Sequence, residues 1–85
     1  MYNNYQYIDI NILIVMHINA AKLGRNIKRL RHRKGISQET LAYYAQLRLS
    51  NLAKLEGGFN ANPTLTTLIS VARVLTRGSI DRLLH

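Results

Sequence analysis

The chain contains no cysteine, which excludes a disulfide scaffold and any metal site built on thiolates. Its three histidines, His17, His32 and His85, are scattered and have no carboxylate at metal-ligand spacing, so we expect neither a metal nor a cofactor. Acidic residues are scarce too: Asp and Glu number 4 in total, and no carboxylate pair, activated nucleophile or phosphate-cradling glycine loop is recognisable. The sequence therefore predicts a protein that is not an enzyme.

Long apolar runs are missing as well. The unbroken run at residues 12–16 is far shorter than the roughly 20 residues that cross a bilayer. No Lys or Arg precedes this run and no small-residue cleavage site follows it, which argues against a signal peptide. We expect no membrane partner, and the lack of cysteine is compatible with a reducing cytoplasm.

What the chain has in excess is positive charge. Its 85 residues include 12 Lys and Arg, which give a net charge of +8 and a pI of about 10.5. Such a balance favours polyanions or acidic surfaces and fits nucleic acid, although a solubilising surface charge would give the same composition. The hydrophobic fraction of 47% and the chain length indicate one folded domain with a modest core.

Residues 1–19 form an arm that differs in pattern from the domain expected at residues 20–85. Ile8, Ile10, Ile12 and Ile14 occupy alternate positions, and a period of two in β-branched residues favours a strand. Three interpretations are open. The arm is a strand that pairs with its own copy in a dimer, a poorly ordered extension, or an upstream segment with Met16 as the start of the working domain.

From Asn19 onward the pattern is helical, with no internal repeat. Asn19, Ser37 and Thr64 each have the side chain of a helix N-cap, and glycines follow the first and third apolar stripes. The sequence therefore predicts an all-α bundle of five short helices, at about residues 20–33, 38–45 and 49–55, after Thr64, and at residues 80–84.

The second and third of these helices carry the most informative spacing. Leu41, Ala42 and Ala45 fall on one face of the second helix, and Leu52 and Leu55 fall on one face of the third. A tight corner between them would place the side chain at position 47, a leucine, inside. This arrangement is typical of a helix-turn-helix, in which the second of the two helices lies in a DNA major groove.

Four stretches extend this pattern over about three quarters of the chain. They are LGRNIKRLRHRKGISQETLA, LAKLEGG, NPTLTTLISVARVL and SIDRLL. In this combination they resemble the XRE/Cro-type helix-turn-helix family, which includes the lambdoid phage repressors and the restriction-modification controller proteins. The resemblance implies a five-helix, lambda-repressor-like bundle that binds a palindromic operator as a homodimer. It also implies a bacterial or phage-type regulator of transcription, a repressor or controller protein that lies on nucleoid DNA in the cytoplasm.

Two positions depart from the family pattern. The corner between the two motif helices usually has glycine, and this chain has Gln46, so a residue with a side chain would adopt positive φ at a cost of roughly 1 kcal/mol. Arg48 stands where a small N-capping residue usually precedes the recognition helix, which loses a cap worth about 1 kcal/mol. We expect the motif to form with reduced local stability.

The exposed N-terminal end of the recognition helix is where base contacts are expected. The candidates are Arg48, Leu49, Ser50 and Asn51. An arginine fork fits guanine O6 and N7, asparagine fits adenine, serine fits either base, and leucine fits a thymine methyl. The alternatives are that Arg48 clamps a phosphate and that Leu49 belongs to the core.

Phosphate contacts are expected beside these residues. Asn60 and Asn62 can donate to the DNA backbone or simply form the turn, and Lys54 is either a phosphate contact or a solvated charge. The free N–H groups after Ser37 also suit a phosphate. The resemblance implies that Gln38 bridges phosphate or base and supports the base-contacting residues, whereas its alternative role is helix initiation.

The resemblance also implies an ion pair between Arg31 and Glu56, which would connect the first helix to the recognition helix. Partial burial would make this pair costly to break, whereas two exposed charges would contribute little. The other basic residues of the first helix are expected to form a solvated face. We expect the dimer interface to be formed by three apolar residues of the last helix, Ile80, Leu83 and Leu84. Val71 and Val74 are additional candidates for this interface. The competing interpretation places them all in the monomer core.

Two further functions remain open. An antitoxin would share the fold but mask a toxin as well as bind its own operator, and a toxin gene beside this one would indicate it. A protein–protein adaptor would use the bundle as a scaffold for a partner not identified by the sequence. In an adaptor, changes at Arg48 and Ser50 would leave function intact.

Overall fold

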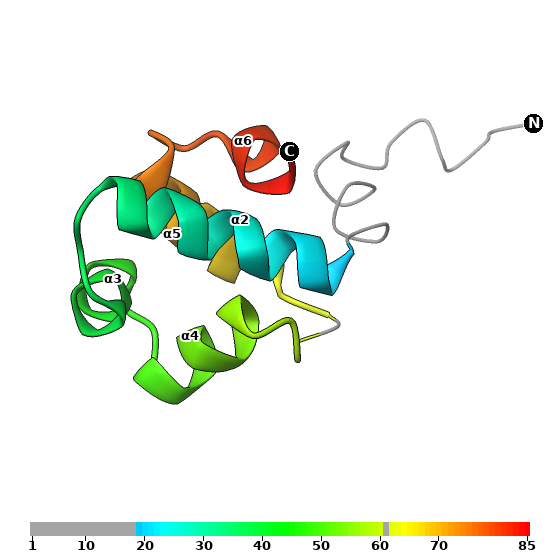
Figure 1. Cartoon of the computed structure of the whole chain (residues 1–85), viewed down its shortest axis with the longest axis horizontal. Helices are drawn as coiled ribbons and strands as arrows, with labels where there is room; N and C mark the ends of the chain where they lie inside the picture. Colours follow the sequence, from blue (N-terminus) through cyan, green and yellow to red (C-terminus); the bar gives the residue numbers. More distant parts are fainter. Residues whose placement is uncertain (1–18, 61) are drawn as a thin grey trace, which may run out of the picture.

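The computed structural model describes residues 19–60 and 62–85, which form an all-α bundle (Figure 1). Its helices are α2 (Ala20–Arg33), α3 (Gln38–Ala45), α4 (Leu49–Glu56), α5 (Leu65–Leu75) and α6 (Ile80–Leu84). The all-α helix-turn-helix bundle predicted from the sequence is confirmed, and α4 is one residue longer than expected. The predictions for the N-terminal arm, namely a strand, a poorly ordered extension or a domain start at Met16, concern residues 1–19. Of these, only Asn19 lies within the described ranges.

Four of the five helices begin at a side chain that accepts a hydrogen bond from the first turn. The caps are Asn19, Ser37, Thr64 and Ser79, which accept from the backbone N–H groups of Lys22, Thr40, Thr67 and Arg82. Each bond satisfies one of the N–H groups that have no partner within a helix. The starting points of these helices are therefore set by local sequence.

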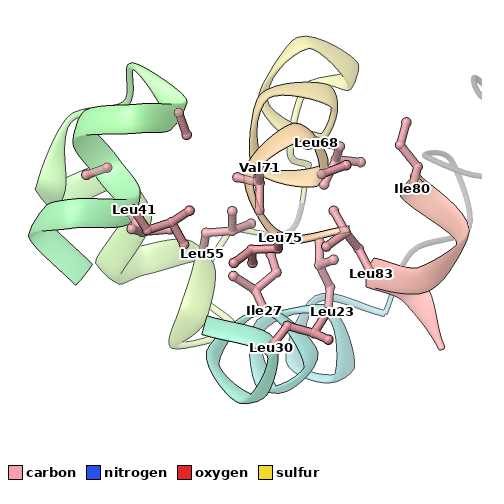
Figure 2. Packing of buried hydrophobic residues seen from close by; sticks show 14 residues of the cluster. Leu23, Ile27, Leu30, Leu41, Leu55, Leu68, Val71, Leu75, Ile80 and Leu83 are labelled. Carbon is pink, nitrogen blue, oxygen red and sulfur yellow. The ribbon is translucent and has the colours of Figure 1, made fainter. Parts of the chain in front are cut away.

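Apolar side chains from all five helices meet in one core (Figure 2). Helix α2 contributes Leu23, Ile27 and Leu30, spaced so that they lie on one face, and α5 contributes Leu68, Val71, Ala72 and Leu75. In Figure 1, α2 crosses the molecule with α3 and α4 on one side and α6 on the other. The core thus holds α4 against the central helix while its outer face stays free.

The short helix α6 closes the bundle and does not extend from it. The side chains of Ile80 and Leu83 are 8% and 0% exposed, and Asn26 Nδ2 of α2 donates a hydrogen bond of 2.9 Å to the Leu83 carbonyl. These two side chains are buried in the monomer's own core, which agrees with the competing interpretation for Ile80 and Leu83, and a dimer interface on α6 stays a prediction. Val71 is also fully buried, whereas Leu84 and Val74 remain partly accessible.

Candidate nucleic-acid interface

The corner between α3 and α4 is made by Gln46, which adopts the left-handed conformation with φ 57° and ψ 42°. Its N–H group bonds to carbonyls of the last turn of α3, and the Leu47 N–H donates to Ala42 O at 2.8 Å. The chain turns sharply there, and Leu47 packs against the core. The positive φ expected at this non-glycine position is present, in a region that disfavours residues with a Cβ.

The N-terminal end of α4 is exposed to solvent. Arg48 is its N-cap residue and makes no capping hydrogen bond through its side chain. Leu52 and Leu55 hold the inner face of the helix in the core. The outer face presents all four candidate base-contacting residues together with Lys54, and each of them is exposed: Arg48, Leu49, Ser50, Asn51 and Lys54. Leu49 is thus not a core residue.

The C-terminal end of α4 is held by a buried polar network. Arg31 of α2 donates from Nε to Glu56 Oε2 at 2.7 Å and from Nη2 to Oε1 at 2.9 Å, and both residues are only 7% exposed. Arg31 Nη1 also donates to the Ile36 carbonyl at 3.0 Å. Gln38 Nε2 donates to Glu56 Oε1 at 3.1 Å. A two-pronged ion pair with additional hydrogen bonds therefore connects α2, the start of α3 and the end of α4.

Gly24 brings α2 and α4 into backbone contact at the same end. A Cβ atom at Gly24 would lie 2.5 Å from Leu55 O and 2.6 Å from Glu56 O, closer than real Cβ atoms approach. Glycine is otherwise costly inside a helix, by roughly 1 kcal/mol relative to alanine. The close approach explains why the position has no side chain, and it fixes the distance between the two helices.

A groove of about 350 Å³ runs between α4 and the loop that follows it. Asn51 and Lys54 of α4 line it from one side, and Asn60 and Asn62 of the loop line it from the other. The Asn60 side-chain oxygen accepts from the Asn62 N–H at 3.1 Å, so Asn60 also shapes the turn. The structure therefore brings four of the sequence-predicted contact residues together along one surface.

Three features of this region were not found from the sequence. Phe59 lines the groove and is 83% exposed. The sequence signal for it was an apolar residue inside a run of turn-forming residues. The sequence signal for the close α2–α4 contact at Gly24 was a glycine inside a helical pattern, where this residue usually has a packing reason. The hydrogen bond between Gln38 and Glu56 had no signal in one sequence, because it joins residues 18 apart whose distance is set by packing.

One comparison with known proteins identifies the chain. A protein-family model for a helix-turn-helix matches residues 27–83, well over half of the sequence. No curated protein and no solved structure gives a significant match. Among the described helices, none has the length and apolar character needed to cross a membrane. The matched range contains the α3–α4 corner, the buried network and the groove described above.

Proposed function

The chain belongs to the XRE-type helix-turn-helix family of DNA-binding transcription regulators, and we propose that it recognises a specific operator through the N-terminal end of α4. The observation that carries this proposal is the contrast along that helix. Arg48, Ser50 and Asn51 are exposed at one end, and Glu56 is buried at the other. A helix held at its C-terminal end presents its N-terminal side chains in a fixed orientation, which base recognition requires.

Each exposed residue has a base edge that suits it. The Arg48 guanidinium matches guanine O6 and N7, and the Asn51 amide matches adenine N6 and N7. The Ser50 hydroxyl suits either base, and the Leu49 side chain, 43% exposed, suits a thymine methyl group. These contacts give the expected sequence preference in the major groove.

Neighbouring groups fit the phosphate backbone. Of the first N–H groups of α3, that of Thr40 bonds to the Ser37 cap, whereas those of Gln38 and Glu39 have no partner within the helix and suit a phosphate. Gln38 uses one N–H of its Nε2 on Glu56, and the second N–H of the same amide remains free to donate to a phosphate oxygen. Lys54, Asn60 and Asn62 along the groove complete a set of backbone contacts that fixes the position of the duplex without specifying sequence.

We further propose that the protein acts as a homodimeric repressor or controller on a palindromic operator in the nucleoid of a bacterial or phage-type system. Two recognition helices would then lie about 34 Å apart, one turn of DNA. With Ile80 and Leu83 buried, the contact between copies falls to the partly accessible Leu84 and Val74. A Leu84→Asp change is expected to convert the dimer to a monomer in sedimentation equilibrium and to leave the fold intact.

Selection of bound sequences from a random duplex pool tests the specific recognition. We expect two half-sites related by a twofold axis, and gel-shift titrations should then prefer that duplex over a scrambled one. Asn51→Ala should relax the preference at one base position, and Arg77→Ala, a truncation of an exposed residue in the turn between α5 and α6, should not. Binding of the wild type that is equal for all sequences would reject the proposal.

A second candidate, a protein–protein adaptor, is favoured by one observation. Tyr43 and Tyr44 on α3 are 77% and 65% exposed, and their rings form an edge-to-face pair with centroids 5.4 Å apart. Tyrosine is enriched at protein interfaces. If this pair were the functional site, a Tyr43→Ser/Tyr44→Ser variant would lose function while Arg48→Ala and Ser50→Ala would not, which is the reverse of the outcome expected for an operator-binding protein.

A further inference from the structure

The outward face of α2 carries more positive charge than the recognition helix does. We define this basic face by five side chains that together line a shallow hollow of about 510 Å³: Arg25, Lys28, Arg29, His32 and Arg33. All five are exposed. Within residues 19–60 and 62–85 the ion pairs are Arg31–Glu56 and His85–Asp81, so no described carboxylate neutralises this face. The outer face of α4, by comparison, holds the two cations Arg48 and Lys54.

The basic face does not point toward the duplex that α4 would bind. Gly24 and Arg31 mark the side of α2 that contacts α4, through backbone proximity and through the ion pair. At about 100° per residue, Arg29 lies roughly 150° around the helix axis from that side. Arg25 and Arg33, one turn before and one turn after it, continue the row over about 12 Å of helix. A straight duplex beneath α4 therefore leaves this row facing outward.

The chemistry of the basic face fits a phosphate backbone better than a protein. Protein interfaces are built around aromatic and aliphatic anchors and contain few charged residues at their centre. The large apolar residues exposed in the described chain are Tyr43, Tyr44, Leu49 and Phe59, and none of them lies on α2. Three arginines in a row, by contrast, offer planar forks that bind phosphate oxygens in pairs.

We propose that the basic face of α2 is a second DNA-binding surface, which holds the phosphate backbone of a duplex other than the one that α4 recognises. This inference rests on the proposed function, because it treats the α4 surface as already occupied by DNA. The protein then joins two DNA segments, one through base contacts and one through charge. Binding at the second surface depends on phosphates alone and is independent of sequence.

A two-duplex capture assay tests this surface with the full chain. An immobilised 30-base-pair duplex that carries the operator obtained from the selection above is saturated with protein and washed. It is then exposed to a second, labelled duplex of unrelated sequence. We expect Arg25→Gln/Arg29→Gln/Arg33→Gln to reduce capture of the second duplex at least about tenfold and its salt slope by about three, one for each lost phosphate contact. Binding of the first duplex should change far less.

Arg73→Gln/Arg77→Gln/Arg82→Gln is the matched control, because it removes three exposed arginines from outside α2. It should retain capture, and equal losses in both variants would reduce the effect to net charge and overturn the proposal. Full capture by the α2 variant would overturn it as well. If poly-glutamate displaced the second duplex at the same concentration as unlabelled DNA, the surface would be assigned to an acidic protein instead. Failure to bind even the first duplex would reject the proposed function, whereas binding of one duplex and never two rejects this inference alone.

Discussion

The two ends of α4 are built differently. At the C-terminal end Glu56 is buried, accepts from Arg31 and Gln38, and lies against the backbone of Gly24. At the N-terminal end Arg48 makes no side-chain cap, and the preceding corner residue, Gln46, has positive φ. The same eight-residue helix is therefore firmly held where it meets the bundle and locally strained where it meets solvent.

This difference separates stability from recognition. The groups that fix the orientation of α4 lie at the end away from the expected base edges, so they can be buried without affecting the side chains that we propose contact DNA. The N-terminal end instead carries Arg48 in place of a better cap, which is the pattern expected where a binding residue occupies a position that stability alone would give to serine or threonine.

The largest effect is expected from breaking the held end with Arg31→Met. Glu56 would keep its hydrogen bond from Gln38 but would remain a buried charge without its counterion, and we expect a loss of about 3–5 kcal/mol in the free energy of unfolding. Urea denaturation followed by circular dichroism measures this change. A loss below about 1 kcal/mol would mean that the Arg31–Glu56 pair contributes no more than an exposed salt bridge does. The two ends of α4 would then not differ in how firmly they are held.

The double variant Arg31→Met/Glu56→Leu keeps this prediction testable even if the single variant does not fold. It removes both charges and replaces them with apolar side chains, so no carboxylate is left unpaired. We expect it to recover most of the lost stability, as buried ion pairs replaced by hydrophobic residues commonly do. A double variant as unstable as the single one would show that packing, and not the unpaired charge, causes the loss.

The next effect is expected from Gly24→Ala, which pushes the held end away from α2. The new methyl group would overlap the Leu55 and Glu56 carbonyls, and such overpacking costs about 1–3 kcal/mol, offset in part by the higher helix propensity of alanine. Gly57→Ala is the matched control, because its methyl group would mainly meet the exposed Phe59 ring, which can move aside. Equal unfolding midpoints for the two variants would contradict a fixed α2–α4 distance.

The parts of this fold that local chemistry controls were predictable from the sequence. Ser37 caps α3 because its hydroxyl accepts from the Thr40 N–H, and Asn19 caps α2 in the same way. Gly35, with φ 68°, follows the end of α2 where a glycine was expected to end it. The helix-turn-helix spacing likewise fixed which faces of α3 and α4 are buried.

What the sequence left undecided depends on distances between helices. The apolar stripe of α6 fits a core and a dimer surface equally well, and only the position of Asn26 next to the Leu83 carbonyl shows that α6 packs inward. The ion pair at Glu56 was expected from a family resemblance, but its third partner, Gln38, came from packing alone. Phe59 was overlooked because turn residues around it suggested only a linker.

A smaller effect is expected at the strained corner. Gln46→Gly removes the Cβ from a residue with φ 57°, and we expect a gain of about 0.5–1 kcal/mol after the greater freedom of glycine in the unfolded chain is subtracted. Gln46→Ala keeps the Cβ and so should change the stability little. If alanine stabilised the protein as much as glycine, the side chain of Gln46, and not its backbone conformation, would be the source of the strain.

The smallest change in stability, and the sharpest test of the contrast, is expected from Arg48→Ser. The backbone at this position already has the extended conformation of an N-cap, with φ −67° and ψ 138°. The new hydroxyl can share the Asn51 N–H, which now donates to the Arg48 carbonyl at 3.0 Å, and should add only about 0.5 kcal/mol. The same change removes the Arg48 guanidinium from the proposed DNA-binding surface of the protein. If that guanidinium contacts a base, DNA binding should weaken by about 1–3 kcal/mol. Arg77→Ser, which removes an arginine from a turn that precedes the Ser79 cap, should alter neither quantity much. If Arg48→Ser raises the stability and lowers the affinity for DNA, the arginine at this N-cap position serves binding at the expense of stability. If the variant gains stability and keeps full affinity, Arg48 does not belong to the interface.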